Sequence, residues 1–312
     1  MTTFAFVFPG QGSQAVGMLD AWGDHPAVRH TLMEASDALG EDVARLIREG
    51  PKDQLDLTTN TQPVMLTAGI ACYRAWLAEG GLAPSVVAGH SLGEYSALVA
   101  AGALTLTDAL PLVRFRAQAM QDAVPVGAGA MAAILGLDAQ AVRDGCAEAA
   151  VASGETVAAA NFNDPKQTVI AGTKAGVDRA CELLKAKGAK RALLLAVSAP
   201  FHSSLMKPAA DRLKDKLSAT TLAAPQIPLI NNIDVKIETD PALIRDALYR
   251  QSFGAVRWVE TVQAIRSRGI LHIVECGPGK VLAGMVKRIE ADTISAAIYD
   301  PATLAEAKGM LA

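Results

Sequence analysis

Short apolar runs alternate along this chain with longer stretches of helical spacing. Residues 4–8, 86–89 and 271–276 are short apolar runs bounded by turn residues, as expected for strands buried inside a sheet. Residues 62–79, and a stretch that begins at Leu92, follow helical spacing instead. A strand over 294–299 and a helix over 279–289 complete the outer part of the chain. This alternation predicts an α/β protein with a mostly parallel sheet.

The middle of the chain has a different order of elements. The expected elements there are a strand over 130–137, a helix over 139–151, strands over 156–162 and 168–171, a helix over 174–187 and a strand over 190–197. This βαββαβ order is that of a ferredoxin-like unit. A flexible link, Val126-Gly127-Ala128-Gly129, introduces it. We therefore predict a large domain formed by residues 1–126 and 199–312, with a small domain inserted over residues 127–198.

Composition excludes several classes of protein. Hydrophobic residues make up 51% of the 312 residues and charged residues 20%, which suits a buried core and argues against disorder. The net charge of -3 gives no general attraction to nucleic acid or to an anionic membrane. The first apolar run ends at Pro9 and follows no basic segment, so it is predicted to be a strand and not a signal peptide. No run reaches the ~18 apolar residues of a membrane span.

The cysteines point to a cytoplasmic protein without a metal site. Their spacing matches neither a disulfide framework nor a set of metal ligands, so we expect buried, reduced thiols. The four residues are Cys72, Cys146, Cys181 and Cys276. Nothing else in the sequence indicates a metal or a tightly bound cofactor.

A nucleophile motif lies between a predicted strand and a predicted helix. Gly89-His90-Ser91-Leu92-Gly93 matches G-x-S-x-G, and its context is that of a strand–elbow–helix turn that holds the serine hydroxyl outward. The first turn of the following helix supplies free N–H groups and a positive dipole end, which suit an oxyanion. The alternative is an ordinary turn whose serine caps the helix.

A nucleophilic serine needs a base, and His202 is the preferred one among five histidines. It lies in a loop, residues 198–204, at the return from the inserted domain, and loops held by rigid strands concentrate catalytic side chains. The alternative is a structural loop histidine. The other four are expected elsewhere: His25 and His30 at the surface, His272 in the core, and His90 with its side chain directed away from the serine into the structure.

An arginine is predicted on an apolar helix face. A helix over 107–121, opened by the cap signal Thr107-Asp108, places Arg116 in the middle of a face formed by Ala109, Leu112, Val113, Ala119 and Met120. A guanidinium keeps its proton and is costly to bury unpaired, so an anion should meet it. Spacing alone does not decide between a structural ion pair and an anionic substrate.

Over nearly its whole length the chain resembles the malonyl-CoA:acyl carrier protein transacylases. The resemblance is carried by Phe8-Pro9-Gly10-Gln11-Gly12-Ser13-Gln14, Gly89-His90-Ser91-Leu92-Gly93-Glu94-Tyr95, Val113-Arg114-Phe115-Arg116, Asn161-Phe162-Asn163, Phe201-His202-Ser203 and Glu275-Cys276-Gly277-Pro278-Gly279. It implies a hydrolase-like large domain with a ferredoxin-like insert, in agreement with the order of elements.

The resemblance also implies the roles of several residues. Ser91 would be the nucleophile and His202 its base. The backbone N–H groups of Gln11 and Leu92 would form an oxyanion hole. A main-chain carbonyl, assigned to Gln251, would orient the histidine, so that the unit is a dyad.

Substrate recognition follows from the same resemblance. Arg116 would hold the free carboxylate of malonate, which a guanidinium can accept in two parallel hydrogen bonds. Asn161 and Asn163 either line the cleft between the domains or form a turn with Asp164-Pro165. A basic cluster in the small domain is either solvated or a docking site for the carrier protein; it comprises Lys185, Lys187, Lys190 and Arg191.

The implied activity is ping-pong transfer of a malonyl group from malonyl-CoA to the phosphopantetheine thiol of acyl carrier protein. We expect a monomer that serves fatty acid biosynthesis. One alternative is a discrete acyltransferase that feeds a polyketide synthase. Another is an acyl-CoA thioester hydrolase, which would need an acid to orient His202. A third is a non-catalytic subunit that only binds acyl-CoA or the carrier. The aspartates considered for this role lie between Ser91 and His202 in the sequence, and most of them fall in the inserted domain: Asp122, Asp138, Asp144, Asp164 and Asp178.

Overall fold

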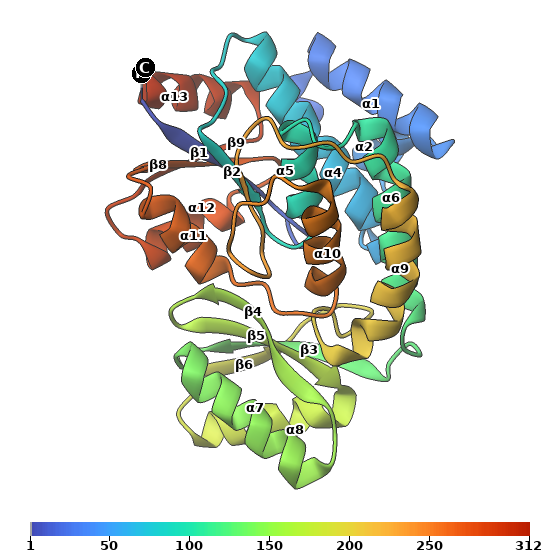
Figure 1. Ribbon diagram of the computed structural model, residues 1–312, viewed down its shortest axis with the longest axis vertical. Coiled ribbons are helices and arrows are strands. Elements are labelled where there is room, and N and C mark those ends of the chain that lie inside the picture. Colours follow the sequence, from blue (N-terminus) through green and yellow to red (C-terminus); the bar gives the residue numbers. More distant parts are fainter. Residues whose placement is uncertain (1) are drawn as a thin grey trace.

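Two β-sheets organise the protein, which a computed structural model describes over residues 2–312 (Figure 1). The larger sheet has five strands in the order β7 (Leu229–Ile230), β2 (Val86–Gly89), β1 (Phe4–Phe8), β8 (His272–Cys276) and β9 (Ile294–Ile298). Each neighbouring pair runs parallel, so the carboxyl ends of all five strands lie at one edge. Loops at that edge are where α/β proteins build ligand sites.

The smaller sheet has four antiparallel strands. Their order is β4 (Val157–Asp164), β5 (Gln167–Thr173), β3 (Gly129–Leu135) and β6 (Arg191–Leu194). Helices α7 (Ala139–Ser153) and α8 (Lys174–Ala186) cover the face that is turned away from the large sheet (Figure 1). The predicted fold class, a parallel α/β domain with a ferredoxin-like insert, is therefore confirmed. The exact limits of the insert, 127 and 198, stay a prediction.

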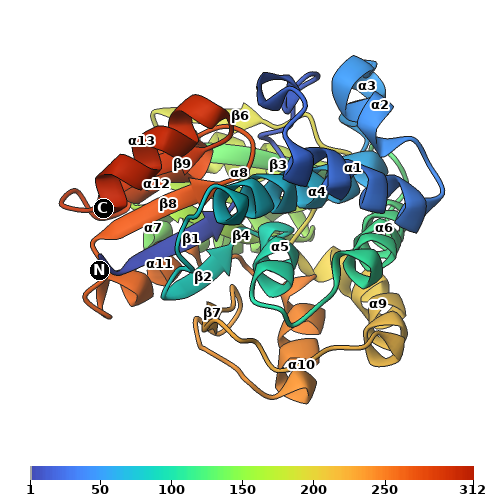
Figure 2. The ribbon, with the colours of Figure 1, turned by 90° about the horizontal axis from the view of Figure 1, so that it is seen from above.

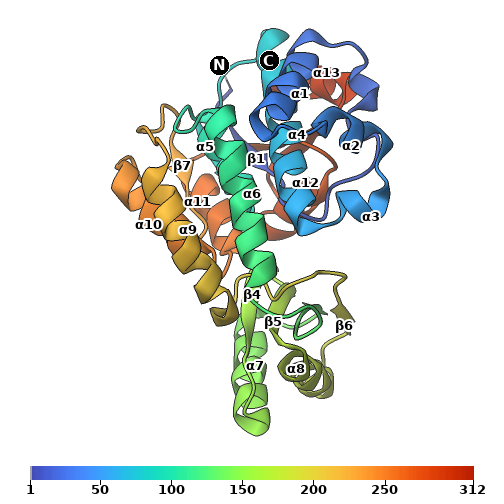
Figure 3. The same ribbon diagram turned by 90° about the vertical axis from the view of Figure 1, so that its right-hand side faces the viewer.

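Helices cover both faces of the large sheet, as a parallel sheet requires (Figure 2). The helices in this part are α1 (Pro26–Leu39), α2 (Val43–Glu49), α3 (Lys52–Leu55), α4 (Thr58–Ala78), α5 (Gly93–Ala100), α6 (Leu106–Asp122), α9 (Lys207–Ala219), α10 (Pro241–Gln251), α11 (Trp258–Arg266), α12 (Val281–Ile289) and α13 (Pro301–Leu311), with 3₁₀ turns at Asp20–Trp22 and Ser204–Met206. The core on one face contains residues of α1, α4, α5, α6 and α13, and the core on the other contains residues of α11 and α12. Figure 3 shows α6 beside α9, with α10 on the far side of α9.

Strand β1 divides these two cores by its alternation of large and small side chains. Its phenylalanines face α4, where the ring of Phe6 meets the rings of Tyr73 and Trp76 at centroid distances of 6.0 and 5.5 Å. The residues between them, Ala5 and Val7, belong to the opposite core. All five side chains of the strand are buried. The strand therefore anchors the sheet to helices on both sides.

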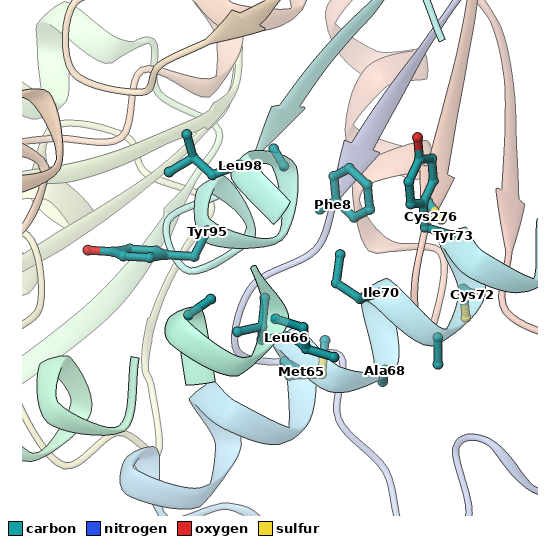
Figure 4. Close-up of a cluster of buried hydrophobic side chains, with 14 of the residues drawn as sticks. Phe8, Met65, Leu66, Ala68, Ile70, Cys72, Tyr73, Tyr95, Leu98 and Cys276 are labelled. Carbon is teal, nitrogen blue, oxygen red and sulfur yellow. The ribbon is translucent and has the colours of Figure 1, made fainter. Parts of the chain in front are cut away.

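Helix α4 also supports the end of β1 that leads to the site. In Figure 4, Ile70 of α4 points toward Phe8, and Leu66 of α4 lies next to helix α5, which carries Tyr95 and Leu98. All five side chains belong to one buried cluster. Close packing of this kind resists small displacements, so the loop after β1 and the start of α5 are held in fixed relation.

Two predicted helix starts are wrong, and polar side chains explain both. Helix α4 begins at Thr58 and not at Gln62, because the hydroxyl of Thr61 donates to main-chain carbonyls of the preceding turn and keeps this polar stretch helical. The cap of α6 is Thr105 and not Thr107, since the Thr105 hydroxyl accepts the N–H three residues ahead at 3.0 Å. Several polar residues near a helix start can each act as its cap, and helical spacing alone did not identify the residue that does.

Helix α4 has 21 residues, sixteen of them buried. Even so, no helix within residues 2–312 combines the length and the apolar run that a bilayer crossing requires.

Removing the central ring of β1 should destabilise the protein. We expect Phe6→Ala to lower the free energy of unfolding by about 3–5 kcal/mol, because it leaves a cavity between the sheet and α4. Urea denaturation followed by circular dichroism measures this change. Met33→Ala on α1 is the control, since its side chain is 62% exposed and should change stability by less than about 0.5 kcal/mol. Equal losses in the two variants would contradict this description of the core.

Candidate active site

A strained turn after β2 presents Ser91 at the edge of the large sheet. Its φ of 52° lies in the left-handed region, which a side chain other than glycine seldom adopts. The flanking glycines permit the turn by close backbone approach. A Cβ on Gly93 would lie 2.0 Å from the carbonyl oxygen of Phe8, and one on Gly89 would lie 1.9 Å from the backbone of Gly93. The serine hydroxyl therefore stands at the carboxyl ends of the strands, beside the first turn of α5.

His202 lies against this serine. Its Nε2 is 2.6 Å from Ser91 Oγ, and its own φ of 60° is also left-handed. The Nδ1 atom is 2.9 Å from the carbonyl oxygen of Gln251, at the end of α10, and 3.1 Å from that of Gly254. A carbonyl only accepts hydrogen bonds, so these contacts place the ring proton on Nδ1 and leave Nε2 free to accept from the serine.

Burial keeps the His202 imidazole neutral. Loss of solvent, followed by the positive charge of Arg116, lowers the pKa of His202 to about 3. The ring is thus an unprotonated acceptor at neutral pH. Its Nδ1 partners are main-chain carbonyls, so within residues 2–312 none of the five aspartates considered above orients it.

Arg116 is buried within hydrogen-bond distance of the serine. Its side chain lies on the apolar face of α6, as helical spacing predicted, and only 2% of its surface is exposed. One guanidinium nitrogen donates to Gln62 Oε1 at 2.6 Å, and the other lies 3.1 Å from Gln251 Oε1 and 3.2 Å from Ser91 Oγ. The Tyr95 ring lies 5.4 Å away. Within residues 2–312 these partners are all uncharged, and no carboxylate forms an ion pair with the guanidinium.

Two backbone N–H groups border the same space. The loop after β1 approaches the elbow so closely that a Cβ on Gly10 would lie 2.5 Å from the carbonyl oxygen of His90. This contact brings Gln11 and Leu92 to one cavity. Among residues 2–312 neither backbone N–H donates a hydrogen bond, and the Gln11 side chain is held by the hydroxyl of Thr58 at 2.9 Å. Both donors are available to an oxygen atom placed between them.

The cavity between the two sheets is small. It has a volume of about 180 Å³ and is lined by Ser91, His202 and Arg116 from the large domain and by Asn161 from β4, with Met120 at its apolar side. This volume holds a short acyl group and not a whole coenzyme. Within residues 2–312, the His, Cys, Asp and Glu side chains form no group of three or more that could hold a metal ion.

Comparison with known proteins identifies the family. Residues 5–302 match the model of the acyl transferase domain. The malonyl CoA-acyl carrier protein transacylase of Escherichia coli is 52% identical over 308 residues, which cover 98% of this chain and 99% of that protein. This chain belongs to the malonyl CoA-acyl carrier protein transacylase family.

Solved structures of the transacylase family share the fold closely. The crystal structure of an acyl-carrier-protein S-malonyltransferase from Burkholderia pseudomallei is 64% identical with a TM-score of 0.96, covering 98% of this chain and 99% of that one. A complex of a type II PKS acyl-carrier protein with its malonyl-transacylase includes a chain that is 50% identical with a TM-score of 0.96, at 98% and 99% coverage.

Three further histidines of this chain differ from His202 in their surroundings. His90 turns from the serine toward β4, where its Nε2 lies 2.9 Å from Asn163 Oδ1 and its ring packs 5.5 Å from that of Trp258. Two expectations are wrong. His272 is half-buried and not in the core, because it is the first residue of β8 and lies at the amino ends of the strands. His25 is half-buried and not at the surface, because it contacts Glu79 at 3.3 Å.

The cysteine prediction holds for three residues of four. All four thiols are free, and Cys72, Cys146 and Cys276 are buried. Cys181 is half-buried, since α8 turns it toward the edge of the small domain's core.

Sequence reasoning missed three polar residues that contact the site. Gln62 accepts a hydrogen bond from Arg116. Asn232 accepts one from the backbone N–H of Ser91, and Glu94 accepts one from the backbone N–H of Asn232. The available signal for Glu94 was a charged side chain inside the apolar stretch of α5. Gln62 follows a run of polar residues at the start of α4 and gave no such signal. Asn232 follows β7, a two-residue strand that is too short for a sequence pattern to detect.

The His202 ring should stay neutral far below the usual histidine range. We expect its ¹⁵N NMR shifts to keep the neutral pattern from pH 8 to pH 5, whereas an unperturbed histidine titrates near ~6.5. The signals are assigned by their loss in His202→Ala. The unfolded chain takes up this proton near ~6.5 and the folded chain does not, so His202 makes the protein less stable as pH falls from that value toward 3. A midpoint near ~6.5 in the folded protein would contradict the site described above.

Proposed function

We propose that this chain transfers the malonyl group of malonyl-CoA to the phosphopantetheine thiol of acyl carrier protein, for fatty acid biosynthesis. The observation that carries the proposal is Arg116. A buried guanidinium with only neutral partners, 3.2 Å from the hydroxyl of a Ser–His pair, calls for an anionic group on the acyl substrate. Malonate brings such a carboxylate. The names of the relatives, malonyl CoA-acyl carrier protein transacylase, agree with this substrate.

In the first half-reaction Ser91 attacks the thioester. His202 Nε2, 2.6 Å away, takes the hydroxyl proton while Oγ bonds to the carbonyl carbon of malonyl-CoA. The N–H groups of Gln11 and Leu92 stabilise the negative oxygen of the tetrahedral intermediate. The C–S bond then breaks, and the departing thiolate of coenzyme A takes the proton from His202. A malonyl ester of Ser91 remains.

In the second half-reaction the carrier thiol takes the place of coenzyme A. His202 accepts the thiol proton, the sulfur attacks the ester carbonyl, and Ser91 leaves with the proton that His202 returns. The carbonyl of Gln251 holds the ring through both steps, and Arg116 keeps the malonate carboxylate in place. Asn161 lines the small-domain side of the cavity and is proposed to contact the acyl group.

Two alternatives differ in what accepts or uses the malonyl group. The solved complex of a 50% identical transacylase with a type II PKS carrier favours a polyketide role as the second candidate. Transfer rates to purified fatty acid and polyketide carriers distinguish the two pathways. Hydrolysis is the other alternative, and loss of the malonyl ester in buffer without a carrier measures it. Monomeric state and cytoplasmic location remain predictions from the sequence.

Ser91→Ala should abolish the covalent intermediate. We expect intact-protein mass spectrometry to show one added malonyl group on the wild type after incubation with malonyl-CoA, and none on Ser91→Ala. Circular dichroism should show the same fold, because the change removes one oxygen. Ser13→Ala, in the loop after β1, is a matched control that keeps the adduct. Full labelling of Ser91→Ala would reject this serine as the nucleophile.

Arg116→Ala should change the choice of substrate. Truncating one partner of a buried charged pair costs about 2–5 kcal/mol, so kcat/KM for malonyl-CoA should fall at least ~30-fold. Acetyl-CoA has no carboxylate to leave unpaired, and its transfer should survive or improve. Steady-state kinetics with both thioesters measure the two values.

The control for this change is Arg114→Ala on the opposite side of α6. Arg114 pairs with Glu41 at 2.6 Å, away from the cavity, so both kcat/KM values should stay near those of the wild type. If Arg116→Ala reduces malonyl and acetyl transfer by the same factor while the protein stays folded, the malonate-binding role of Arg116 is wrong.

A further inference from the structure

Glu94 is a buried carboxylate that the proposed mechanism does not use. It lies in the first turn of α5, three residues after the nucleophile, and 1% of its surface is exposed. One oxygen, Oε2, accepts the backbone N–H of Asn232 at 2.9 Å and the side-chain amide N–H of Gln251 at 3.1 Å. A buried carboxyl group is costly unless hydrogen bonds satisfy its oxygens. Its two partners supply such bonds.

Both partners of Glu94 hold the backbone of the nucleophile. Asn232 Oδ1 accepts the N–H of Ser91 at 2.7 Å, and Asn232 Nδ2 donates to the carbonyl oxygen of Gly89 at 2.7 Å. Gln251 Nε2 donates to the carbonyl oxygen of Ser91 at 2.9 Å. The peptide groups before and after Ser91 are therefore both fixed by residues that Glu94 holds, which offsets the strain of the left-handed serine.

The contact with the Ser91 carbonyl also orients Leu92. The carbonyl of Ser91 and the N–H of Leu92 belong to one planar, trans peptide, so they point in opposite directions. Gln251 holds the carbonyl end on the buried side. The N–H end is thereby directed into the cavity, where the thioester oxygen would become negative.

The acceptor oxygen of Glu94 fixes which way the Gln251 amide faces. Glu94 Oε2 accepts hydrogen bonds from both partners, so the NH₂ end of the amide faces Glu94. Its Oε1 end is then left for Arg116, 3.1 Å away. Reversal of the amide would remove its bonds to Glu94, to Arg116 and to the Ser91 carbonyl together.

We propose that Glu94 is a positioning residue for acyl transfer: through Asn232 and Gln251 it fixes the Ser91 peptide groups and directs the Leu92 N–H at the reacting oxygen. This inference rests on the proposed function, because it assumes that an acyl oxygen forms at that position.

The test compares two side chains of similar size at position 94. Glu94→Met removes both acceptor oxygens, whereas Glu94→Gln keeps an Oε1 atom that can accept from both partners. Single-turnover formation of the acyl-enzyme at saturating thioester should slow by at least ~10-fold in Glu94→Met, since loss of one oxyanion donor costs ~10²–10³. Glu94→Gln should return to within about fivefold of the wild type.

The choice of thioester separates this role from substrate recognition. The oxyanion forms on the oxygen of the thioester carbonyl, a group that both malonyl-CoA and acetyl-CoA contain. Glu94→Met should therefore slow acylation by both thioesters. Arg116→Ala, in contrast, is expected to act on malonyl-CoA alone.

Glu275→Met is the matched control. Glu275 is equally buried, and its Oε2 accepts the N–H of Ala283 at 2.8 Å at the start of α12, away from the cavity. The control should lower the melting temperature without slowing acylation in the folded protein. It reports what the loss of a buried carboxylate does by itself.

Three results would overturn the proposal: wild-type acylation by folded Glu94→Met, equal slowing in Glu94→Met and Glu94→Gln, or slowing with malonyl-CoA only. Should Glu94→Met fail to fold, Asn232→Ala is the second variant: it keeps the backbone N–H that Glu94 accepts but removes the side-chain bonds to Ser91 and Gly89, so it must slow acylation by both thioesters. A wild-type rate there would also overturn the proposal. Absence of any acyl-enzyme on the wild type would instead reject the proposed function.

Discussion

Main-chain contact between the end of β1 and the turn after β2 is the constraint on which the site depends. Gly93 touches the carbonyl of Phe8, and Gly10 touches that of His90, at distances that exclude a side chain on either glycine. These contacts set two loops, far apart in the sequence, beside each other at the sheet's edge. One cavity is therefore bordered by Ser91 and by Gln11 and Leu92, whose backbone N–H groups donate no hydrogen bond within residues 2–312.

The small domain is joined to this edge by more than its two connecting loops. Strand β4 exchanges backbone hydrogen bonds of 2.9 Å with Val256 on either side of Asn161, and Arg288 of α12 pairs with Asp164 at 2.7 Å. His90 adds a side-chain link to Asn163. These bonds hold the part of β4 around Asn161 against the large domain, beside the cavity that Ser91 also lines.

The sequence predicted the parts of the site that local patterns encode. Glycines around Ser91 define the elbow, and helical spacing alone places Arg116 among buried apolar residues. The family resemblance supplied what local patterns do not, such as the carbonyl of Gln251, which the structure places 2.9 Å from His202. Asn232 and Gln62 escaped because their partners are distant in sequence, at separations of 141 and 54 residues. A hydrogen bond of that kind leaves no periodicity in the chain.

The two residues proposed to carry out the chemistry, Ser91 and His202, both adopt an unfavourable backbone conformation. Ser91 and His202 both have left-handed φ values, and each such residue costs of order 1–3 kcal/mol. A protein of ordinary stability has only about 5–15 kcal/mol between its folded and unfolded states. Glycine at both positions would relieve this strain, but it would also remove the serine hydroxyl and the imidazole. The left-handed φ values therefore lower the stability of the fold at the two residues on which the proposed chemistry depends.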